Sequence, residues 1–592
     1  MTKGDQTPTS TTESWIEVII KDTSTLVSIE TWRDGTKEKE KTVEENLEEI
    51  NVFFKGKADA HNKKYPNAQM MPFEWKGKYK DDEGNEKEAW VFGFRAGALE
   101  VPKGTKKPRK VSLICHLDTV PPGNLDWHPF DAREETRVYN GVSTPFLIGR
   151  GAIDDKGPAV VAFEAFTRAL KQVDVDEEGA SNKLKDKLIL EVLFDTSEET
   201  DMSTPHYLDA NSDEEPDLGI VFDAYWSVRA EKGIERPIFT ISNDVTSAPP
   251  ENTWHIADLK SSVGSANMIP VTAEAVINGK NLSDADLDQF VANIYDWYRA
   301  CPFDDVNYHP ADINVTKEKG SEVRITAKVA GAQHGSAPQQ NRANGANPIV
   351  SLTNFLAFLV DRDILANNHF SEMCKFIRWA FGTWPFGENH PELLYRFDPV
   401  YGEGNGTTYG LTQLFSEINP ISNKDGINLG IDVRYAIGHH GHGWDGREGK
   451  IKGKSIFKKV FKELTSRYKT EAGGATVTVE TKTVFGPDIR SPRNAHLFQI
   501  NNAYRSIMGE NCPMRATGGA TDAHGRLNLV TAGALLSENF GPPVNYHGID
   551  EGAPLPDLEN SGKILLYILR QELGISDKHE SHPKNVCHGC CI

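Results

Sequence analysis

Three apolar stretches of this chain each end at side chains that bind metal ions well. Each stretch has the length and composition of a buried strand, and aspartate, glutamate and histidine are the usual ligands of catalytic zinc. The pairs are 111–115 before His116, 188–194 before Glu198 and Glu199, and 219–222 before Asp223. The carboxyl ends of parallel strands meet at one edge of a sheet, so these side chains are expected to lie together. The pattern predicts a two-metal hydrolytic centre.

Strand and helix patterns alternate in the first part of the chain. Residues 15–64 are predicted to be helical, and Pro158 opens a helix whose apolar positions recur at intervals of four, three and four. The stretch 188–194 is apolar except for Glu191, which is typical of a central strand in a parallel sheet. This alternation predicts an α/β domain in which helices flank the sheet.

A chain of 592 residues is too long for one ordinary core, and its pattern changes after Lys232. Strands of antiparallel type are predicted at 238–242, 273–276, 323–329 and 426–435, with helices at 287–300 and 348–359. We expect an inserted α+β domain at 233–486 and a first domain formed by 14–232 and 487–576. Residues 1–13 are expected to be disordered, and 577–592 to form a flexible tail that carries Cys587, Cys590 and Cys591.

The composition excludes several classes of protein. The 65 Lys and Arg residues against 85 Asp and Glu residues give a net charge of −20, which disfavours nucleic acid and anionic membranes as partners. No run of eighteen apolar residues predicts a transmembrane helix, and the polar N-terminus lacks the profile of a secretory signal. Seven cysteines, odd in number and mostly scattered, argue against a disulfide framework. A cytoplasmic protein is expected.

Two further motifs complete the candidate centre. Asp154 and Asp155 follow Gly149-Arg150-Gly151, a turn that lets a carboxylate approach metal ions closely. Far downstream, His547 begins the motif His-Gly-Ile-Asp-Glu after a Gly-Pro-Pro turn. The order and spacing of these motifs resemble the M20 family of metallopeptidases and amidohydrolases, from about residue 15 to about residue 573, and especially the monomeric bacterial dipeptidases. The resemblance implies a zinc-exopeptidase-like catalytic domain, a mixed sheet flanked by helices, with the insert as a lid.

The resemblance also implies how the centre is built. It indicates two Zn²⁺ ions, with Mn²⁺ or Co²⁺ as alternatives, bridged by Asp154, whose peptide bond to Asp155 is often cis in the family. The implied ligands are His116 and Asp223 for one ion and Glu199 and His547 for the other, with Asp118 orienting the His116 ring. Glu198 is the implied general base. His524 is the alternative to His547, which we prefer for its motif.

Residues of the insert and of one glycine-rich loop match the family's substrate contacts. His334 lies in a Gly-Ala-Gln-His-Gly motif whose histidine polarises the scissile carbonyl in the family. Asn267 and Arg434 match lid positions, and a guanidinium suits bidentate binding of a carboxylate. Gly518 and Gly519 resemble the family's glycine loop, although Ala520 stands where Thr or Ser is common.

The reaction implied is hydrolysis of the amide bond of dipeptides or short peptides. In the family, dipeptidases and aminopeptidases tend to have Asp at the position of Asp223, whereas carboxypeptidases and acylases tend to have Glu. An N-acyl-amino-acid amidohydrolase is the nearest alternative. An inactive substrate-binding homologue is the alternative from another class, and retention of Glu198 and all five ligands argues against it. The long insert could supply His334 from the same chain, so a monomer is expected, with a dimer as the alternative.

Overall fold

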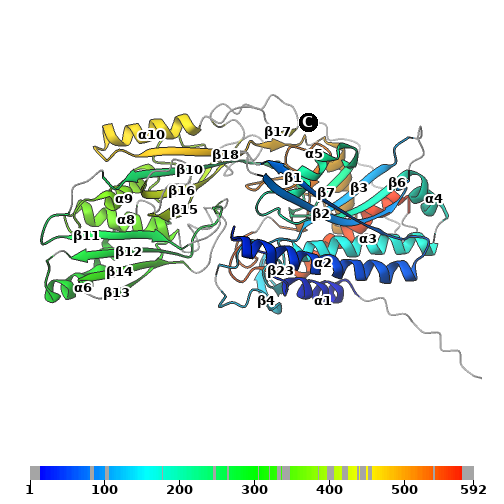
Figure 1. The fold of residues 1–592 in the computed structure, drawn as a ribbon, viewed down its shortest axis with the longest axis horizontal. Helices are drawn as coiled ribbons and strands as arrows, with labels where there is room; N and C mark the ends of the chain where they lie inside the picture. The colour runs from blue at the N-terminus through cyan, green and yellow to red at the C-terminus, as the bar shows by residue number, and fades with distance from the viewer. Residues whose placement is uncertain are drawn as a thin grey trace, which may run out of the picture.

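The computed structural model describes residues 14–575 apart from several internal segments. The segments left out are 81–85, 101–105, 124, 177, 245–248, 263–265, 280, 304–305, 319–320, 330–334, 336–346, 384–385, 396–405, 417–424, 437–438, 440–448, 451–456, 492 and 538–539. Figure 1 shows two bodies side by side along the longest axis of the molecule. The elements from β10 to β16, with α10 and β18, form one body, and most of the others form the second.

A six-stranded mixed sheet organises the larger body. Its strand order is β1 (Met71–Lys80), β2 (Glu86–Gly97), β6 (Leu188–Asp195), β3 (Arg109–His116), β7 (Leu218–Val221) and β21 (Leu529–Thr531). β1 and β2 pair antiparallel, as do β2 and β6, whereas β6, β3, β7 and β21 are parallel. β3 and β6 lie inside the sheet and are buried along nearly their whole lengths, which accounts for their apolar sequences.

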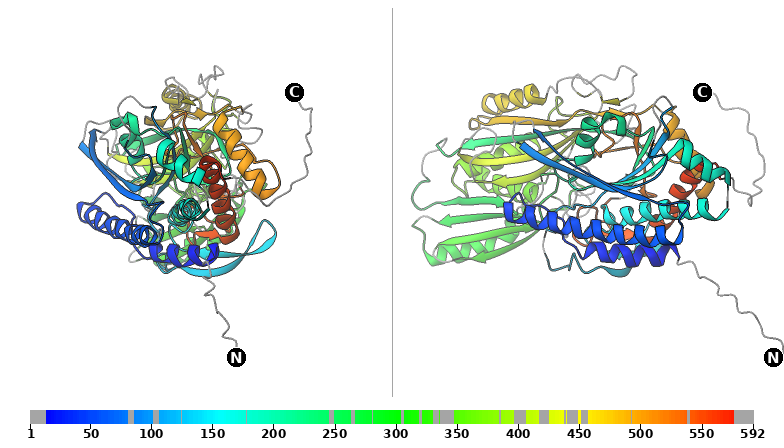
Figure 2. Two further views of the ribbon diagram at one scale, coloured as in Figure 1. Left: turned by 90° about the vertical axis from the view of Figure 1, so that its right-hand side faces the viewer. Right: turned by 45° about the vertical axis from the view of Figure 1, so that its right-hand side comes forward.

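Helices cover the two faces of this sheet unequally. The helices whose side chains share the main core are α1 (Trp15–Val27), α2 (Lys37–Lys64), α3 (Lys156–Asp176), α4 (Glu178–Lys187), α11 (Ala495–Met508) and α12 (Leu555–Leu573). Figures 1 and 2 show α1, α2 and α3 on the same side of the sheet. Phe54 of α2 stacks on Phe194 of β6 with ring centroids 4.5 Å apart. On the opposite face, α5 (Ser203–Ala210) packs Tyr207 and Leu208 against the sheet in a smaller cluster.

Three small sheets complete the larger body. They comprise β23 (Gly552–Pro554), β5 (Val142–Ile148) and β4 (Arg133–Tyr139); β17 (Gly449–Lys450), β19 (Asp488–Ile489), β9 (Val228–Glu231) and β20 (Arg515–Thr517); and the pair β22 (Ala534–Leu535) and β8 (Ala224–Tyr225). A short 3₁₀ helix, η1 (Ser212–Glu214), precedes β7. The strand β23 brings the C-terminal part of the chain beside β5, and the chain from 148 to 156 and the chain before 552 become neighbours through this pairing.

The described residues of the second body form two four-stranded antiparallel sheets and four helices. One sheet has the order β15 (Thr408–Phe415), β16 (Gly426–Tyr435), β10 (Gly233–Ser242) and β18 (Thr478–Phe485), and the other β11 (Trp254–Ser261), β12 (Thr272–Gly279), β14 (Glu322–Lys328) and β13 (Asp312–Lys317). The helices are α6 (Asp284–Ala300), α8 (Pro348–Asp361), α9 (His369–Ala380) and α10 (Phe457–Glu471). Their apolar faces and those of the sheets form a separate core, in which α8 is buried over most of its length.

Two connections between the bodies lie side by side. The chain enters the second body from β9 into β10 and returns from β18 into β19. β9 and β19 pair antiparallel, with Glu231 opposite Asp488. The pairing holds the two crossing segments together at the point where the bodies meet.

Most predicted elements occur at their predicted positions, and the predicted fold class is confirmed. The strand predicted at 426–435 coincides with β16, and the remaining strand and helix predictions fall within or overlap the observed elements. The helical structure predicted over 15–64 is confirmed in α1 and α2, but the chain leaves the helix between Val27 and Lys37. Gly35 adopts a φ of 79°, and Thr36 then caps a new helix by accepting a hydrogen bond from the Lys39 amide.

Several predictions concern features that the structure does not test. Residues 1–13 and 577–592, including the three tail cysteines, lie outside the described residues, which end at Ile575. The domain limits at 232/233 and 486/487 and the monomeric state stay predictions. None of the helices in the described ranges combines the length and apolar character that crossing a membrane demands.

Asp557, in the first turn of α12, predicts a pH dependence of stability. Burial raises the pKa of this carboxyl to about 6, although hydrogen bonds from the Leu536 amide and the Tyr139 hydroxyl oppose the shift. The unfolded pKa is about 4, so folding binds the proton more tightly, and this stabilisation is present at low pH and lost as pH rises through about 6.

The substitution Asp557→Asn should remove that dependence. In urea unfolding of metal-free protein, the stability of the variant minus that of the wild type should be about 2–3 kcal/mol larger at about pH 7 than at about pH 4. A difference that stays constant across this range would show that Asp557 does not titrate in this way.

Candidate metal centre

The carboxyl ends of three parallel strands converge at one edge of the six-stranded sheet. β3 ends at His116, the chain reaches Asp223 just after β7, and the turn after β6 carries Glu198 and Glu199. β3 pairs in parallel with both β6 and β7, so His116 stands between the other two strand ends. The strand order therefore brings these four side chains together.

Asp154 lies between two histidines. Its Oδ1 atom is 2.9 Å from Nε2 of His116, and its Oδ2 atom is 2.5 Å from Nε2 of His547. Oδ2 of Asp223 is 3.8 Å from the same nitrogen of His116, and Oε1 of Glu199 is 3.1 Å from that of His547. Two groups that could hold a metal ion result, His116–Asp154–Asp223 and Asp154–Glu199–His547, and they share one carboxylate.

The arrangement of oxygen atoms fits metal binding. Within the described part of the chain, Asp154 Oδ2 and Glu199 Oε1 are buried and receive no hydrogen bond, although Nε2 of His547 lies against both. Buried carboxylate oxygens normally accept hydrogen bonds or coordinate ions. Imidazole and carboxylate donors suit Zn²⁺, Mn²⁺ and Co²⁺. The donors present therefore fit a pair of divalent ions.

The electrostatics of the centre favour bound positive charge. Burial raises the pKa of Glu199 to about 7, with His547 opposing the shift and Asp154 adding to it. Burial alone would lower the pKa of His547, but Glu199 and Asp154 outweigh it and raise the value to about 10. The two imidazoles hold the pKa of Asp154 well below its usual range despite its burial. The buried carboxylates therefore favour positive charge in the centre, and bound divalent ions would supply it.

Cys115, next to His116, belongs to neither ligand group. Among the described residues both groups at this centre consist of imidazoles and carboxylates.

Asp118 joins the two strand ends that carry the ligands. Its carboxylate accepts hydrogen bonds from the backbone amides of Glu198 and Glu199, at 3.0 and 3.1 Å. Nδ1 of His116 lies 3.0 Å from the main-chain oxygen of Asp118 and 3.5 Å from its Oδ1 atom. The carboxylate of Asp118 therefore positions the Glu198–Glu199 turn as well as lying beside the His116 ring.

Arg150 and Glu551 brace the two loops that carry Asp154 and His547. The buried Glu551 carboxylate accepts hydrogen bonds from the backbone amides of Gly151, Ile153 and Asp154, at 3.0–3.3 Å, and forms an ion pair with Arg150. Arg150 in turn donates to the main-chain oxygen of His547 at 3.1 Å. The peptide bond between Asp154 and Asp155 is cis, as the resemblance implies.

These bracing residues and Tyr546 did not emerge from the sequence patterns. Tyr546 donates a hydrogen bond from its hydroxyl to Oδ1 of Asp223, the oxygen that does not face His116. Tyr546 is adjacent to His547, and Glu551 ends the His547 motif, so proximity to a ligand motif was the available signal. Their roles depend on which strands and loops become neighbours, which spacing in the sequence does not give.

A cavity of about 780 Å³ joins the centre to the second body. Its lining includes Glu198 and the candidate ligands Asp154, Glu199, Asp223 and His547, together with Asn267, Arg434 and Gly519. The Arg434 guanidinium is held by Asp432, with Nε 2.7 Å from Oδ2, and donates to the main-chain oxygen of Gly518 at 2.7 Å. Asn267, Arg434 and the glycine loop thus face the metal centre across one cavity, whereas His334 lies outside the described residues.

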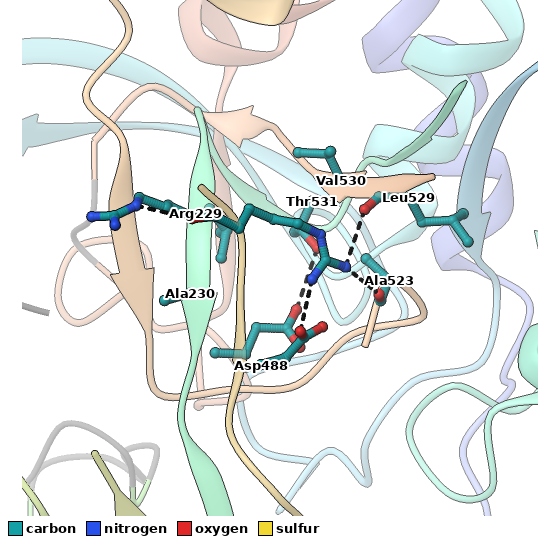
Figure 3. Close-up of a pocket in the computed structure, with 10 residues that line it drawn as sticks. Arg229, Ala230, Asp488, Ala523, Leu529, Val530 and Thr531 are labelled. Atoms are coloured by element: carbon teal, nitrogen blue, oxygen red, sulfur yellow. Dashed lines mark hydrogen bonds and ion pairs between the residues drawn. The ribbon is translucent and has the colours of Figure 1, made fainter. Parts of the chain in front are cut away.

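His524 belongs to a different group of side chains. Its Nδ1 atom is 2.6 Å from Oε2 of Glu231, where β9 and β19 cross between the bodies. Asp488 completes this group, but its Oδ1 atom binds Arg490 at 2.7 Å, and its Oδ2 atom accepts from the Gly525 amide. Figure 3 shows Asp488 beside Ala523 and Leu529, whose main-chain oxygens also accept from Arg490. These carboxylates already have partners at the crossing point.

The comparison with protein families identifies the class. The model of the family described as "Peptidase family M20/M25/M40" matches residues 113–571, which is more than half of the chain and includes every candidate ligand. The chain belongs to this family and is a metallopeptidase of the kind that uses divalent metal ions.

Individual relatives carry names of the same kind. A protein of Staphylococcus saprophyticus named "Putative dipeptidase" is 26% identical over 526 residues, which cover 86% of this chain and 92% of that protein. A Staphylococcus aureus protein with the same description is 24% identical over 75% of this chain and 79% of its own length. Among solved structures, human carnosine dipeptidase 1 is 10% identical, with a TM-score of 0.48 over 94% of this chain and 96% of that one. The di-peptidase Dug1p from Saccharomyces cerevisiae is 9% identical, with a TM-score of 0.46 over 95% and 99%.

Glu551 is expected to affect metal binding although it is not a candidate ligand, because it holds the loops that carry Asp154 and His547. Glu551→Gln removes the charge that faces Arg150 and should lower the affinity for Zn²⁺ by about 10–100-fold, because residues that orient ligands usually have effects of this size. Competition with a chelator measures the affinity directly.

The neighbouring Asp550→Asn provides the matched control. Asp550 is partly exposed and pairs with Arg133 rather than with the brace, so its substitution should leave Zn²⁺ affinity within about twofold. Equal affinities for Glu551→Gln and the wild type would show that the brace does not position the ligands.

Proposed function

We propose that this chain is a dinuclear zinc dipeptidase. The single observation that carries the proposal is the shared Asp154, whose two oxygens face two histidines and thereby join two ligand groups into one centre. His116, Asp154 and Asp223 would hold one ion, and Asp154, Glu199 and His547 the other. When bound, the two ions would supply positive charge that polarises the scissile carbonyl and makes water more acidic.

Glu198 is the proposed general base. It lines the cavity beside the ligands, and its backbone is fixed by Asp118. Desolvation raises the pKa of Glu198 well above its usual range, and Asp223 and Glu199 add to the shift while His116 opposes it. A carboxylate with a raised pKa is a better general base near neutral pH. Glu198 would take a proton from the attacking water and return it to the leaving amine.

Arg434 is the proposed partner of the substrate's C-terminal carboxylate. Asp432 and the Gly518 main chain orient the guanidinium from one side, and the cavity lies on another. Asn267 is proposed to contact the substrate from the same wall, and His334 to polarise the scissile carbonyl. A cavity with ligands at one end and a guanidinium at the other suits a short peptide with a free carboxyl terminus.

The choice of a dipeptidase rests on two supports. Asp223 is the residue type that the resemblance associates with dipeptidases and aminopeptidases, and the relatives that cover most of the chain are named as dipeptidases. An N-acyl-amino-acid amidohydrolase would use the same centre. Hydrolysis of a panel of dipeptides and N-acyl-amino acids by the Zn²⁺-loaded protein tests the choice, and faster turnover of the N-acyl compounds would overturn it.

Glu198 and Glu199 are expected to behave differently although they are neighbours. Glu198→Ala should retain both ions and lose about 10²–10⁴-fold in kcat, because it removes a general base that is not a ligand. Glu199→Ala should lose metal, because Glu199 is a ligand. Elemental analysis and steady-state kinetics on the two variants make the comparison. Loss of metal in Glu198→Ala with full occupancy in Glu199→Ala would reverse the assignment.

Arg434 is expected to act on substrates with a free carboxylate. Arg434→Ala should lower kcat/KM for dipeptides far more than for their C-terminal amides, because loss of a desolvated charged contact typically costs about 2–5 kcal/mol. The control is Arg378→Ala. Arg378 of α9 is more exposed than Arg434 and pairs with Asp361 at the end of α8. Equal losses on acids and amides would remove Arg434 from carboxylate recognition.

A further inference from the structure

A second guanidinium faces the cavity beside Arg434. Arg236 lies in β10, and its partner across the sheet is Lys482 of β18. Directly opposed residues of antiparallel strands project to the same face, and residues two apart on one strand do so as well. Five residues of β10, β16 and β18 that line the cavity follow this rule: Ile234, Arg236, Arg434, Lys482 and Val484. Phe485, at the end of β18, also lines the cavity but lies at the register shift between Ile234 and Glu235. The sheet formed by β15, β16, β10 and β18, here called the lid sheet, therefore presents three cations to the cavity.

The acids on this face already have partners. Asp432 holds Arg434 through its Oδ2 atom at 2.7 Å, and Glu480, two residues before Lys482, pairs with Lys458. Within the described residues the Arg236 side chain forms no ion pair and no hydrogen bond, and its buried Nε atom has no acceptor. Burial lowers the pKa of Arg236 from its usual value, Asp432 opposes this shift, and Arg434 adds to it. A guanidinium in this position is unfavourable for the empty site unless a bound anion compensates it.

The position of Arg236 defines which anion fits. Ile234, two residues before Arg236, is the cross-strand partner of Arg434, so the two arginines are diagonal neighbours. Side chains in that relation are about 7–8 Å apart and lie within reach of one small ligand. In a C-terminal aspartate or glutamate, two or three carbon atoms separate the side-chain carboxylate from the main-chain carboxylate. If Arg434 binds the main-chain group, Arg236 is left for the side-chain group.

We propose that Arg236, with Lys482 opposite it, is a specificity subsite for the side-chain carboxylate of an acidic C-terminal residue. The substrate class is then dipeptides that end in aspartate or glutamate. The inference rests on the proposed dipeptidase function and names the substrate preference of that site. The rival role, in which Arg236 and Arg434 together bind only the main-chain carboxylate, gives no preference between acidic and neutral side chains.

The test compares two nearly isosteric peptides. For the full chain loaded with Zn²⁺, kcat/KM for Ala-Glu should exceed that for Ala-Gln by about tenfold or more, as expected for one charge-assisted contact. In Arg236→Gln this ratio should fall to about 1, chiefly through KM for Ala-Glu. Arg236→Lys should keep an intermediate ratio, because it retains the charge without the planar fork.

The control removes a charge from the same body without touching the cavity. Lys459 of α10 is highly exposed and pairs with Glu463, so Lys459→Gln should keep the wild-type ratio. Equal losses on both peptides in Arg236→Gln would overturn the subsite, as would a wild-type ratio of about 1. The wild-type ratio and Arg236→Lys decide the matter if Arg236→Gln does not fold.

A binding experiment separates this inference from the proposed function. If the wild type hydrolyses neither peptide, the dipeptidase proposal fails, and calorimetry with free glutamate and glutamine tests the subsite alone. Tighter binding of glutamate by the wild type, lost in Arg236→Gln, would support the subsite. Equal binding of the two amino acids would overturn it.

Discussion

The contact between Asp154 and two histidines is the constraint on which the rest of the centre depends. Its two oxygens face His116 and His547, which come from parts of the chain more than four hundred residues apart. Buried acids surround this pair, and burial raises the pKa of Asp223 and Glu198. Such a cluster is unfavourable unless cations compensate it. The fold therefore has to hold negative charge in a geometry that only bound cations make favourable.

That requirement accounts for the rigid surroundings. Arg150 and Glu551 connect the loop before α3 with the loop that carries His547, and Asp118 fixes the turn after β6. Each brace uses a charged group to bind several main-chain atoms of a ligand loop. Ligands on strand ends inherit their positions from the sheet, whereas those on loops need such contacts. The braces accordingly occur where Asp154, His547 and the Glu198–Glu199 turn leave regular structure.

The sequence predicts the strand-borne part of this arrangement well and the loop-borne part less well. The apolar runs before His116 and Asp223 lie in β3 and β7, because a buried parallel strand must be apolar throughout. The interruption between α1 and α2 escaped prediction because Gly35 and Thr36 are short-range signals within a strongly helical composition. The contacts of Tyr546 and Glu551 escaped because they depend on the neighbours that the fold supplies. Arg236 escaped because it lies just before the strand predicted at 238–242, and the absence of a partner for its side chain is visible only in the fold.

The distribution of charge also explains how an acidic protein could favour acidic substrates. The net charge of −20 repels an anionic peptide at long range, but screening limits that repulsion to about 8–10 Å at physiological ionic strength. Within the cavity, acids gather on the catalytic side and Arg236, Arg434 and Lys482 on the lid sheet. A peptide would bridge the two sides of the cavity if its scissile bond lay at metal ions bound by the acids and its carboxylates lay at these three cations. Because the wall of cations belongs to the second body and the ligands to the first, such a peptide would also hold the two bodies together, which links substrate choice to closure of the lid.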